Sequence, residues 1–396
     1  MTLRSSWKRF YDAQTIMYAN YRKGSMMNRL IGRCITVLAA GAAAIATLTA
    51  TTGVAEAATF HDRSAARAGV DALSGFYNTD TGLWDTTGWW NSANALTATI
   101  DYALATGDHS HDKIIENTYK LNLDAQNGQF TNDYLDDTGW WALAWIRAYD
   151  LTGKKKYLQT AAHDVDFMWS YRTDTCGGGV LWNRTKTYKN AVTNELLIKA
   201  AASLHNRIHG DQKYLSMATT NWDWFVDSGM INSDNMINDG LTDDCANNGQ
   251  TTWTYNQGII LGAAVELADA TGDDSYLRTA SQLADASTTN SAIIVDGVLT
   301  EPCEADGGDC GGDGPSFKGA YIRGLGELNA ALHGRPYQDF LLKQAETAYQ
   351  HDRTASNLYG VHWAGPIGAI TAATQHSAVE ALIAPLWQQR IGHHRH

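Results

Sequence analysis

Two consecutive carboxylates are the residues best suited to chemistry in this sequence. Residues 84–90 (WDTTGWW) are matched 51 residues later by residues 135–141 (LDDTGWW), and the second copy places Asp137 directly after Asp136. Neighbouring residues at the start of a helix point about 100° apart, so their carboxyl groups can flank one ligand atom within about 5–6 Å. Hydrolysis of a glycosidic bond with retained configuration needs two carboxyl groups at about that separation.

The two carboxyl groups are expected to differ in acidity. The positive end of a helix lowers the pKa of the carboxylate that it faces, which favours an ionised nucleophile. A like charge beside it raises the pKa of the other carboxyl group, which favours a protonated acid. The alternative interpretation is that one aspartate caps the helix and its neighbour is solvated.

Aromatic residues suggest what the carboxylates act on. The chain of 396 residues has 14 Trp and 18 Tyr, and the flat C–H face of a sugar packs on an indole ring. Candidate stacking residues, with core packing as the alternative, are Trp89, Trp140, Trp182 and Phe317. Candidate hydroxyl-binding residues near predicted helix starts, with helix capping as the alternative, are Asn194, Asp239, Tyr255 and Asn256.

The elements that must position these residues are helical. Five junctions place a glycine between an Ala/Leu-rich segment and a polar residue, which is typical of two helices joined by a tight turn; they lie at residues 106–108, 152–154, 209–211, 271–273 and 333–335. Periodicity predicts about twelve helices, at residues 61–77, 88–106, 109–121, 138–152, 154–171, 188–209, 211–229, 252–271, 274–290, 316–333, 336–352 and 373–388.

Twelve helices in six hairpins predict an all-α fold, an (α/α)6 barrel. The alternative is an open helical solenoid, which needs polar capping repeats. Connections after the even-numbered helices are expected to be short, and those before them long. Hairpin alternation then places the long loops at one end of the barrel, above the starts of the even-numbered helices, where a binding site is expected.

Composition and the N-terminal segment indicate in which compartment the protein works and which partners are unsuitable. The formal net charge is −12, which argues against nucleic acid or an anionic membrane surface as a partner. Residues 1–57 are predicted to be a signal peptide ending in an Ala-x-Ala site, with residues 1–25 as an over-extended start and a membrane anchor as the alternative. Residues 58–396 would then form one secreted, monomeric catalytic domain that acts outside the membrane.

The cysteines agree with an oxidising compartment. Cys34 would leave with the signal peptide, and four cysteines remain. Cys303 and Cys310 enclose a six-residue loop and are expected to pair, so Cys176 pairs with Cys245 by elimination. No ligand spacing supports zinc, and the aspartates around residues 306–313 miss the EF-hand pattern. We expect no metal and no cofactor.

Residues 132–141 (NDYLDDTGWW) resemble the signature of glycoside hydrolase family 76, the secreted endo-α-1,6-mannanases. Further similar segments follow in order over most of residues 60–390: CGGGVLWN at 176–183, YKNAVTNEL at 188–196, NDG at 238–240, TWTYNQG at 252–258 and FKG at 317–319. The resemblance implies an (α/α)6 barrel and a retaining mechanism on α-1,6-linked mannan. It implies that Asp136 is the nucleophile and Asp137 the general acid/base.

Two other functions are compatible with these residues. Fungal relatives of the family are thought to be transglycosidases on glycolipid-anchored mannose, but the chain ends without a hydrophobic anchor signal, which favours a soluble hydrolase. A glycan-binding protein without catalysis is the third hypothesis, although both aspartates are present. Lys318 and Arg323 are expected to pair with acidic residues of the barrel instead of contacting sugar.

Overall fold

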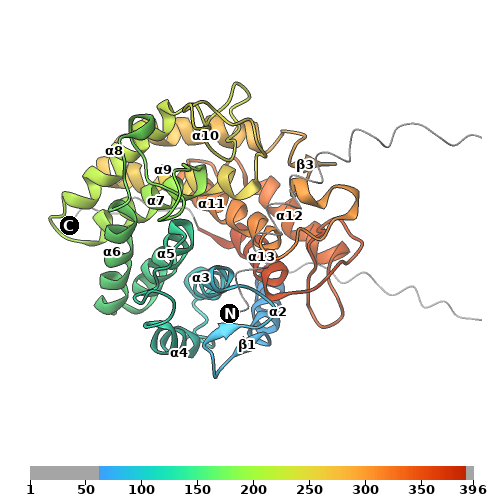
Figure 1. The fold of residues 1–396 in the computed structure, drawn as a ribbon. Helices are drawn as coiled ribbons and strands as arrows, with labels where there is room; N and C mark the ends of the chain where they lie inside the picture. Colours follow the sequence, from blue (N-terminus) through green and yellow to red (C-terminus); the bar gives the residue numbers. More distant parts are fainter. Residues whose placement is uncertain (1–61, 389–396) are drawn as a thin grey trace, which may run out of the picture. The chain divides into compact units, whose positions relative to one another are not determined.

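The structure, a computed structural model, describes residues 62–388, and α-helices make up most of this part (Figure 1). The α-helices are α2 (Asp62–Ser74), α3 (Trp89–Thr106), α4 (Lys113–Asn122), α5 (Leu135–Thr152), α6 (Lys155–Trp169), α7 (Ala191–Arg207), α8 (Lys213–Asp227), α9 (Thr254–Thr271), α10 (Ser275–Ser287), α11 (Phe317–Ala331), α12 (Gln338–His351) and α13 (Ala372–Ile383). The short 3₁₀ helices are η1 (Thr175–Gly177), η2 (Pro302–Gly307), η3 (Gly314–Ser316) and η4 (Ala384–Leu386).

Strands are confined to two small hairpins in the described part. β1 (Tyr77–Asn78) pairs antiparallel with β2 (Leu83–Trp84), and β3 (Ile294–Val295) pairs with β4 (Val298–Leu299). No helix within residues 62–388 combines the length and the apolar character that a bilayer crossing needs. The predicted signal peptide lies outside the described residues and stays a prediction.

Six alternate helices form a closed inner ring. α3 contacts α5, and the contacts continue through α7, α9 and α11 to α13, which returns to α3. The other six helices lie outside this ring, so α6 packs on α5 and α7 while α8 packs on α7. The predicted (α/α)6 barrel is therefore confirmed, and the open solenoid is wrong because the last inner helix contacts the first.

Burial distinguishes the two layers. The inner helix α9 is buried at every residue from Thr254 to Ala268, whereas the outer helix α10 buries only four of its residues. An inner helix is covered on all sides by the ring and the outer layer, so even the polar residues Asn256, Gln257 and Glu266 of α9 are buried. Glycines in the left-handed conformation end α3, α5 and α9, as the hairpin turns require, at Gly107, Gly153 and Gly272.

The helix boundaries explain where the site forms. All twelve predicted helices are present, and the connections that follow inner helices are short, such as residues 153–154 and 272–274. Long loops precede the inner helices, for example residues 170–190 and 228–253. Because each short connection reverses the chain, the inner helices all begin at the end of the barrel that carries the long loops.

α9 and α11 approach so closely that two glycines touch. A Cβ atom on Gly324 would overlap the main chain of Gly258, with the carbonyl carbon at 2.6 Å, and a Cβ atom on Gly258 would lie 2.8 Å from the carbonyl oxygen of Tyr321. Both obstacles are main-chain atoms of inner helices. They cannot move without separating the two helices.

Gly324→Ala should therefore lower the free energy of unfolding by about 3 kcal/mol, because the added methyl group overpacks the helix contact. Gly326→Ala in the same helix is the matched control, since its Cβ would meet side-chain or Cβ atoms of Ala384 and Trp387 at 3.2 and 3.3 Å. That control should stay within about 1 kcal/mol of the parent, helped by the higher helix propensity of alanine. Urea denaturation measures both, and equal losses would contradict the close helix contact.

Candidate active site

The consecutive aspartates lie in the first turn of α5, and each has its own hydrogen-bond donors. The Oδ1 atom of Asp136 accepts a hydrogen bond from the main-chain N–H of Asp137 at 3.1 Å, and its Oδ2 accepts one from Nε1 of Trp182 at 3.0 Å. The Oδ2 atom of Asp137 accepts a hydrogen bond from Nδ2 of Asn132 at 2.5 Å. Two donors therefore hold the Asp136 carboxylate and one holds that of Asp137.

The loop before α7 completes the start of α5. The main-chain N–H of Leu135 donates to the carbonyl of Trp182 at 2.9 Å, and the N–H of Trp182 donates to the carbonyl of Tyr188 at 2.9 Å. The residue before the helix, Tyr134, supplies no side-chain cap. The loop thus satisfies a free donor of the helix start and, in doing so, places the indole of Trp182 over Asp136.

Burial controls the acidity of both aspartates. It raises the pKa of Asp136 to about 7, although the donors from Trp182 and the helix start lower it. Burial also raises the pKa of Asp137 well above its usual range, and the neighbouring charge of Asp136 raises it further. The main-chain donors of the helix start lower the pKa of Asp136 as expected, but desolvation outweighs them, so the pKa is raised overall. The expected effect of a like charge is present, since the neighbouring Asp136 raises the pKa of Asp137.

Aromatic rings from four inner helices gather beside the aspartates. Trp90 of α3 stacks on Trp140 of α5 with ring centroids 5.7 Å apart and planes inclined by 25°. Phe317 of α11 lies 6.3 Å from Trp90 and 4.2 Å from Tyr255 of α9. Trp253, the residue before α9, meets Phe317 edge-on at 5.7 Å. Trp90, Trp253 and Phe317 are half-buried and offer flat apolar surface to a sugar ring, whereas Trp140 and Tyr255 are buried.

A third carboxylate faces the pair. The indole Nε1 of Trp90 donates to Oδ1 of Asp313 at 2.9 Å, and burial raises the pKa of Asp313. The charge of Asp313 contributes to the raised pKa of both Asp136 and Asp137. Asp313 comes directly before η3 and α11, so the loop from Cys303 to Asp313 places it next to the aspartate pair.

Asp239 marks the other side of the site. The Tyr188 hydroxyl donates a short hydrogen bond to its Oδ2, and Trp253 also donates to this carboxylate. Burial raises the pKa of Tyr255, and the charges of Asp239 and Asp136 raise it further, so Tyr255 lies close to both carboxylates. Candidate hydroxyl-binding groups therefore surround the aspartate pair.

Both predicted disulfides are present, and they brace the loops around the site. Cys176–Cys245 joins the loop before α7 to the loop before α9, and Cys303–Cys310 closes the loop before α11. A Cβ atom on Gly314 would lie 2.6 Å from the Cβ of Cys310, so the second disulfide packs directly against the residue after Asp313.

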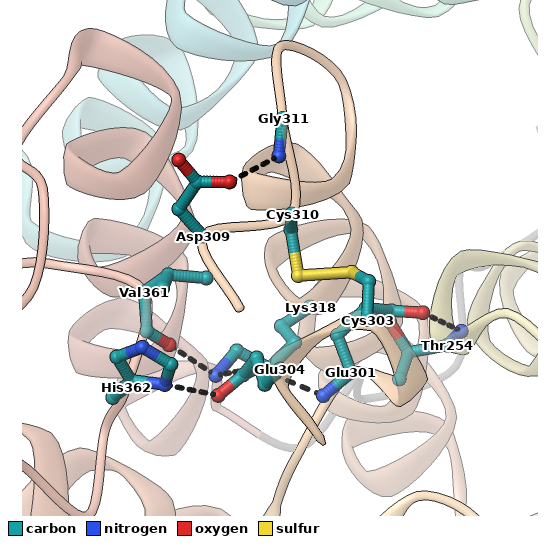
Figure 2. Close-up of a disulfide and its surroundings, with 10 residues drawn as sticks. All are labelled: Thr254, Glu301, Cys303, Glu304, Asp309, Cys310, Gly311, Lys318, Val361 and His362. Atoms are coloured by element: carbon teal, nitrogen blue, oxygen red, sulfur yellow. Dashed lines mark hydrogen bonds and ion pairs between the residues drawn. A yellow bond between two sulfur atoms is a disulfide. The ribbon is translucent and has the colours of Figure 1, made fainter. Parts of the chain in front are cut away.

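Buried ion pairs hold the Cys303–Cys310 loop on the barrel (Figure 2). The Nζ atom of Lys318 lies 2.6 Å from Oε1 of Glu304, and His362 approaches the other oxygen of Glu304 at 3.3 Å. Glu301 accepts a hydrogen bond from the main-chain N–H of Thr254 at 3.2 Å. The loop is thereby tied to the starts of α9 and α11. The expected pairing of Lys318 with an acidic residue is confirmed.

A model of the family described as glycosyl hydrolase family 76 matches residues 62–393. The chain belongs to this family. The family resemblance stated from the motifs is confirmed.

Solved structures are similar to this chain over most of its length. One is an α-1,6-mannanase of Salegentibacter sp. HEL1_6, an inactive variant with two aspartates replaced by alanine, in complex with α-1,6-mannotetrose. It is 25% identical with a TM-score of 0.74, and the match covers 83% of this chain and 99% of that one. A Listeria innocua protein is 27% identical with a TM-score of 0.75, covering 85% and 100% of the two chains.

Curated relatives carry names of mannan-cleaving enzymes. The mannan endo-1,6-alpha-mannosidase DCW1 of Saccharomyces cerevisiae is 28% identical over 261 residues, which are 60% of this chain and 57% of the relative. The mannan endo-1,6-alpha-mannosidase DFG5 of the same yeast is 26% identical over 306 residues, 69% and 65% of the two chains. This family 76 chain therefore spans less than two thirds of the length of these relatives.

The sequence-predicted residues are not all placed alike. Trp140, Trp182, Asp239, Tyr255 and Phe317 lie around the aspartate pair, as described above. Trp89 instead packs on the buried Trp141, with ring centroids 5.4 Å apart.

Two predicted asparagines are fully buried. Asn194 exchanges hydrogen bonds with the main chain of Val180 at 2.8 and 3.1 Å and donates to the carbonyl of Asn190 at 2.8 Å, so its side chain holds the preceding loop in place. Asn256 is also fully buried, and neither polar atom of its side chain has a partner in the described residues. We keep neither among the sugar-contacting residues of this family 76 site.

Sequence reasoning missed Trp90 and Asp313. Trp90 follows Trp89 in the repeated WDTTGWW segment. Periodicity does not determine which of two adjacent indole side chains points toward the site at the end of the barrel. In the sequence, Asp313 belongs to the group of aspartates at residues 306–313 that misses the EF-hand pattern. Its signal is its position four residues before Phe317, in the loop that leads to the FKG segment.

Asp313→Asn should move the pH profile of hydrolysis to lower pH by about half a unit to one unit, because losing a nearby negative charge lowers the pKa of Asp136 and Asp137. The measurement is kcat/KM between pH 4 and 9. Asp309→Asn is the matched control, since Asp309 lies in the same loop but is exposed. An equal shift for both variants, or none for Asp313→Asn, would contradict the electrostatic influence of Asp313.

Proposed function

We propose that this chain is a retaining glycoside hydrolase that cleaves α-1,6-mannosidic bonds in mannan. The observation that carries the proposal is the pair of adjacent aspartates at the start of α5, because two hydrogen-bond donors hold Asp136 while burial and the neighbouring charge raise the pKa of Asp137. Asp136 is the nucleophile, since two donors favour its ionised form. Asp137 is the general acid/base, since burial and the neighbouring charge favour its protonated form.

The reaction follows from these two roles. An oxygen of Asp136 attacks the anomeric carbon, the bond from that carbon to the 6-oxygen of the next mannose breaks, and Asp137 gives its proton to the departing oxygen. A mannosyl ester of Asp136 with inverted configuration results. Water then gives a proton to Asp137 and attacks the same carbon, which breaks the ester and restores the α configuration.

The surrounding residues bind the chain of sugars. Trp90 and Phe317 supply flat apolar surface for the C–H faces of mannose, with Trp140 stacked on Trp90, while Asp239 and Tyr255 supply partners for hydroxyl groups. Trp182 keeps its indole N–H on Asp136 and so orients the nucleophile. The names of the similar mannanase and of the curated relatives support mannan as the substrate.

We also propose that the enzyme works outside the cell. Two disulfides brace the loops of the site, and disulfides persist in oxidising compartments. The predicted signal peptide over residues 1–57 supports the same location. A polymeric substrate such as mannan, which does not cross a membrane, must also be met there.

Incubation of residues 58–396 with unbranched α-1,6-mannan tests the proposal. Product size and anomeric configuration are followed by NMR from the first minutes. We expect short oligosaccharides that appear first as the α-anomer, which requires a double displacement. The β-anomer would contradict Asp136 as a nucleophile, and products longer than the substrate would indicate transglycosylation. Binding of the polymer without any cleavage would instead support the glycan-binding alternative.

A further inference from the structure

A cavity lies beside the proposed active site, between two of the long loops. Its volume is about 250 Å³. This is somewhat smaller than the roughly 300–1,000 Å³ of sites for drug-sized ligands, so it suits a ligand of about one sugar ring. The loop before α7 and the loop before α9 line it, with Thr175, Cys176, Thr187, Tyr188, Lys189, Leu241, Thr242 and Asp243.

The walls of this cavity are held rigidly. The Cys176–Cys245 disulfide joins the two loops at its edge, and the Trp224 indole donates to the carbonyl of Cys176 at 2.8 Å. Lys189 is buried beneath the first loop, and its Nζ donates to the carbonyl of Thr173 at 3.1 Å and, by shorter bonds, to two further carbonyls of that loop. A cavity with such fixed walls is prepared for a ligand, because little ordering remains to be done on binding.

Tyr188 connects the cavity to the aspartate pair. One side of this residue lines the cavity, while its hydroxyl donates to Asp239 and its ring meets that of Trp182 edge-on at 6.1 Å. The Trp182 indole in turn donates to Asp136. The cavity is therefore separated from the catalytic carboxylates by two aromatic side chains, so a ligand there can belong to the same molecule as the reacting sugar.

The lining identifies the class of ligand. Thr175 and Thr187 offer hydroxyl groups and the exposed Asp243 offers a carboxylate, while the Thr242 hydroxyl is bonded to the main chain of Ala246. Leu241 and the disulfide offer apolar surface. The ammonium group of Lys189 is taken up by main-chain carbonyls, so the lining has no cation directed at an anion. Carboxylates and hydroxyls beside an apolar surface suit an uncharged polyol better than a phosphate or a uronic acid.

We propose that this cavity is a remote subsite that binds one mannosyl unit of the polymer whose scissile bond lies at Asp136 and Asp137. The unit is either a backbone mannose beyond the central subsites or a branch attached to the backbone. The proposal rests on the proposed function. It adds that long or branched substrates are bound by a contact that short ones cannot reach.

Thr242→Trp fills the cavity with an indole and tests the proposal. Thr242 is exposed and belongs to neither the aspartate pair nor its donors. We expect kcat/KM on the shortest cleaved linear oligosaccharide to stay within about twofold, whereas longer linear or branched substrates lose about tenfold. Thr220→Trp on the exposed face of α8 is the control and should change neither value. A parallel loss on all lengths, or no loss on any, would overturn the proposal.

Two substrate series distinguish the sources of the mannosyl unit. Linear α-1,6-mannooligosaccharides of increasing length report a backbone unit, and mannan with its branches intact, compared with debranched mannan, reports a branch. A binding measurement separates this proposal from the proposed function. Calorimetric titration of mannotetraose and of branched fragments into Asp136→Asn, with and without Thr242→Trp, needs no turnover. Weaker binding on filling the cavity supports the subsite even if the parent cleaves no mannan, and unchanged binding contradicts it even if the parent is active.

Discussion

Asp136→Ala should reduce kcat on linear α-1,6-mannan by about 10⁴-fold or more, because the first displacement loses its nucleophile. The alanine leaves a space next to the anomeric carbon that a small anion can enter. Added azide should therefore restore part of the turnover on an aryl α-mannoside and yield the β-mannosyl azide. One displacement by azide inverts the configuration, so this product identifies Asp136 as the lost nucleophile.

Asp137→Ala should behave differently on the same substrates. Hydrolysis of mannan should fall by about 10²–10⁴-fold, because the departing 6-oxygen receives no proton. An aryl α-mannoside with an acidic leaving group needs no such proton, so it should still form the ester with Asp136. Azide should then release the α-mannosyl azide, since two displacements retain the configuration.

The two azide products make the assignment decisive. Azides of the same configuration from both variants would contradict separate roles for the two aspartates. Asp133→Ala is the matched control, because Asp133 lies in the same segment and is exposed, paired with Arg184 at 3.1 Å. It should retain nearly the full activity of the parent. Thermal unfolding of all three variants establishes that lost activity does not reflect lost folding.

The barrel could be predicted because its hairpins repeat. A glycine ends α3, α5 and α9 in the left-handed conformation, and this requirement is local, so it is visible in the sequence. The closure of the ring follows from the number of hairpins. The predicted start of α5, residue 138, lies three residues after the observed start at Leu135, because the first N–H group of the helix is satisfied by the distant Trp182 and not by a local cap.

The site is predicted less completely than the fold, because several of its features depend on contacts between residues that are far apart in the sequence. The aspartate pair and both disulfides follow from local sequence patterns. The pKa of Asp136, in contrast, depends on how deeply the loops bury it, and this burial outweighs the helix start. The choice between Trp89 and Trp90 depends on the rotation of α3 against α5. The place of Asp313 depends on the loop closed by Cys303–Cys310, whose path no local pattern specifies.

Glu327→Ala should lower the free energy of unfolding by about 3–5 kcal/mol, the second large effect we expect. Glu327 lies inside the ring on α11, where its Oε2 accepts a hydrogen bond from Lys199 at 2.6 Å and its Oε1 accepts a shorter one from Arg147. Removing the carboxylate leaves Lys199 and Arg147 buried without the negative charge that offsets the cost of their desolvation. Burial already lowers the pKa of Lys199, and losing Glu327 lowers it further, so the variant should lose additional stability as the pH falls.

Glu116→Ala is the matched control for this prediction, because Glu116 also pairs with two cations but does so at the surface. Its carboxylate lies 3.3 Å from Lys154 and 2.6 Å from Lys156, with half of its side chain exposed. Solvent screens such a pair, so the control should lose no more than about 1 kcal/mol. Urea denaturation at pH 5 and pH 8 measures both variants. Similar losses for the two would mean that water reaches the centre of the ring. A large loss only for Glu327→Ala would establish that the charged groups inside the barrel are desolvated and depend on one another.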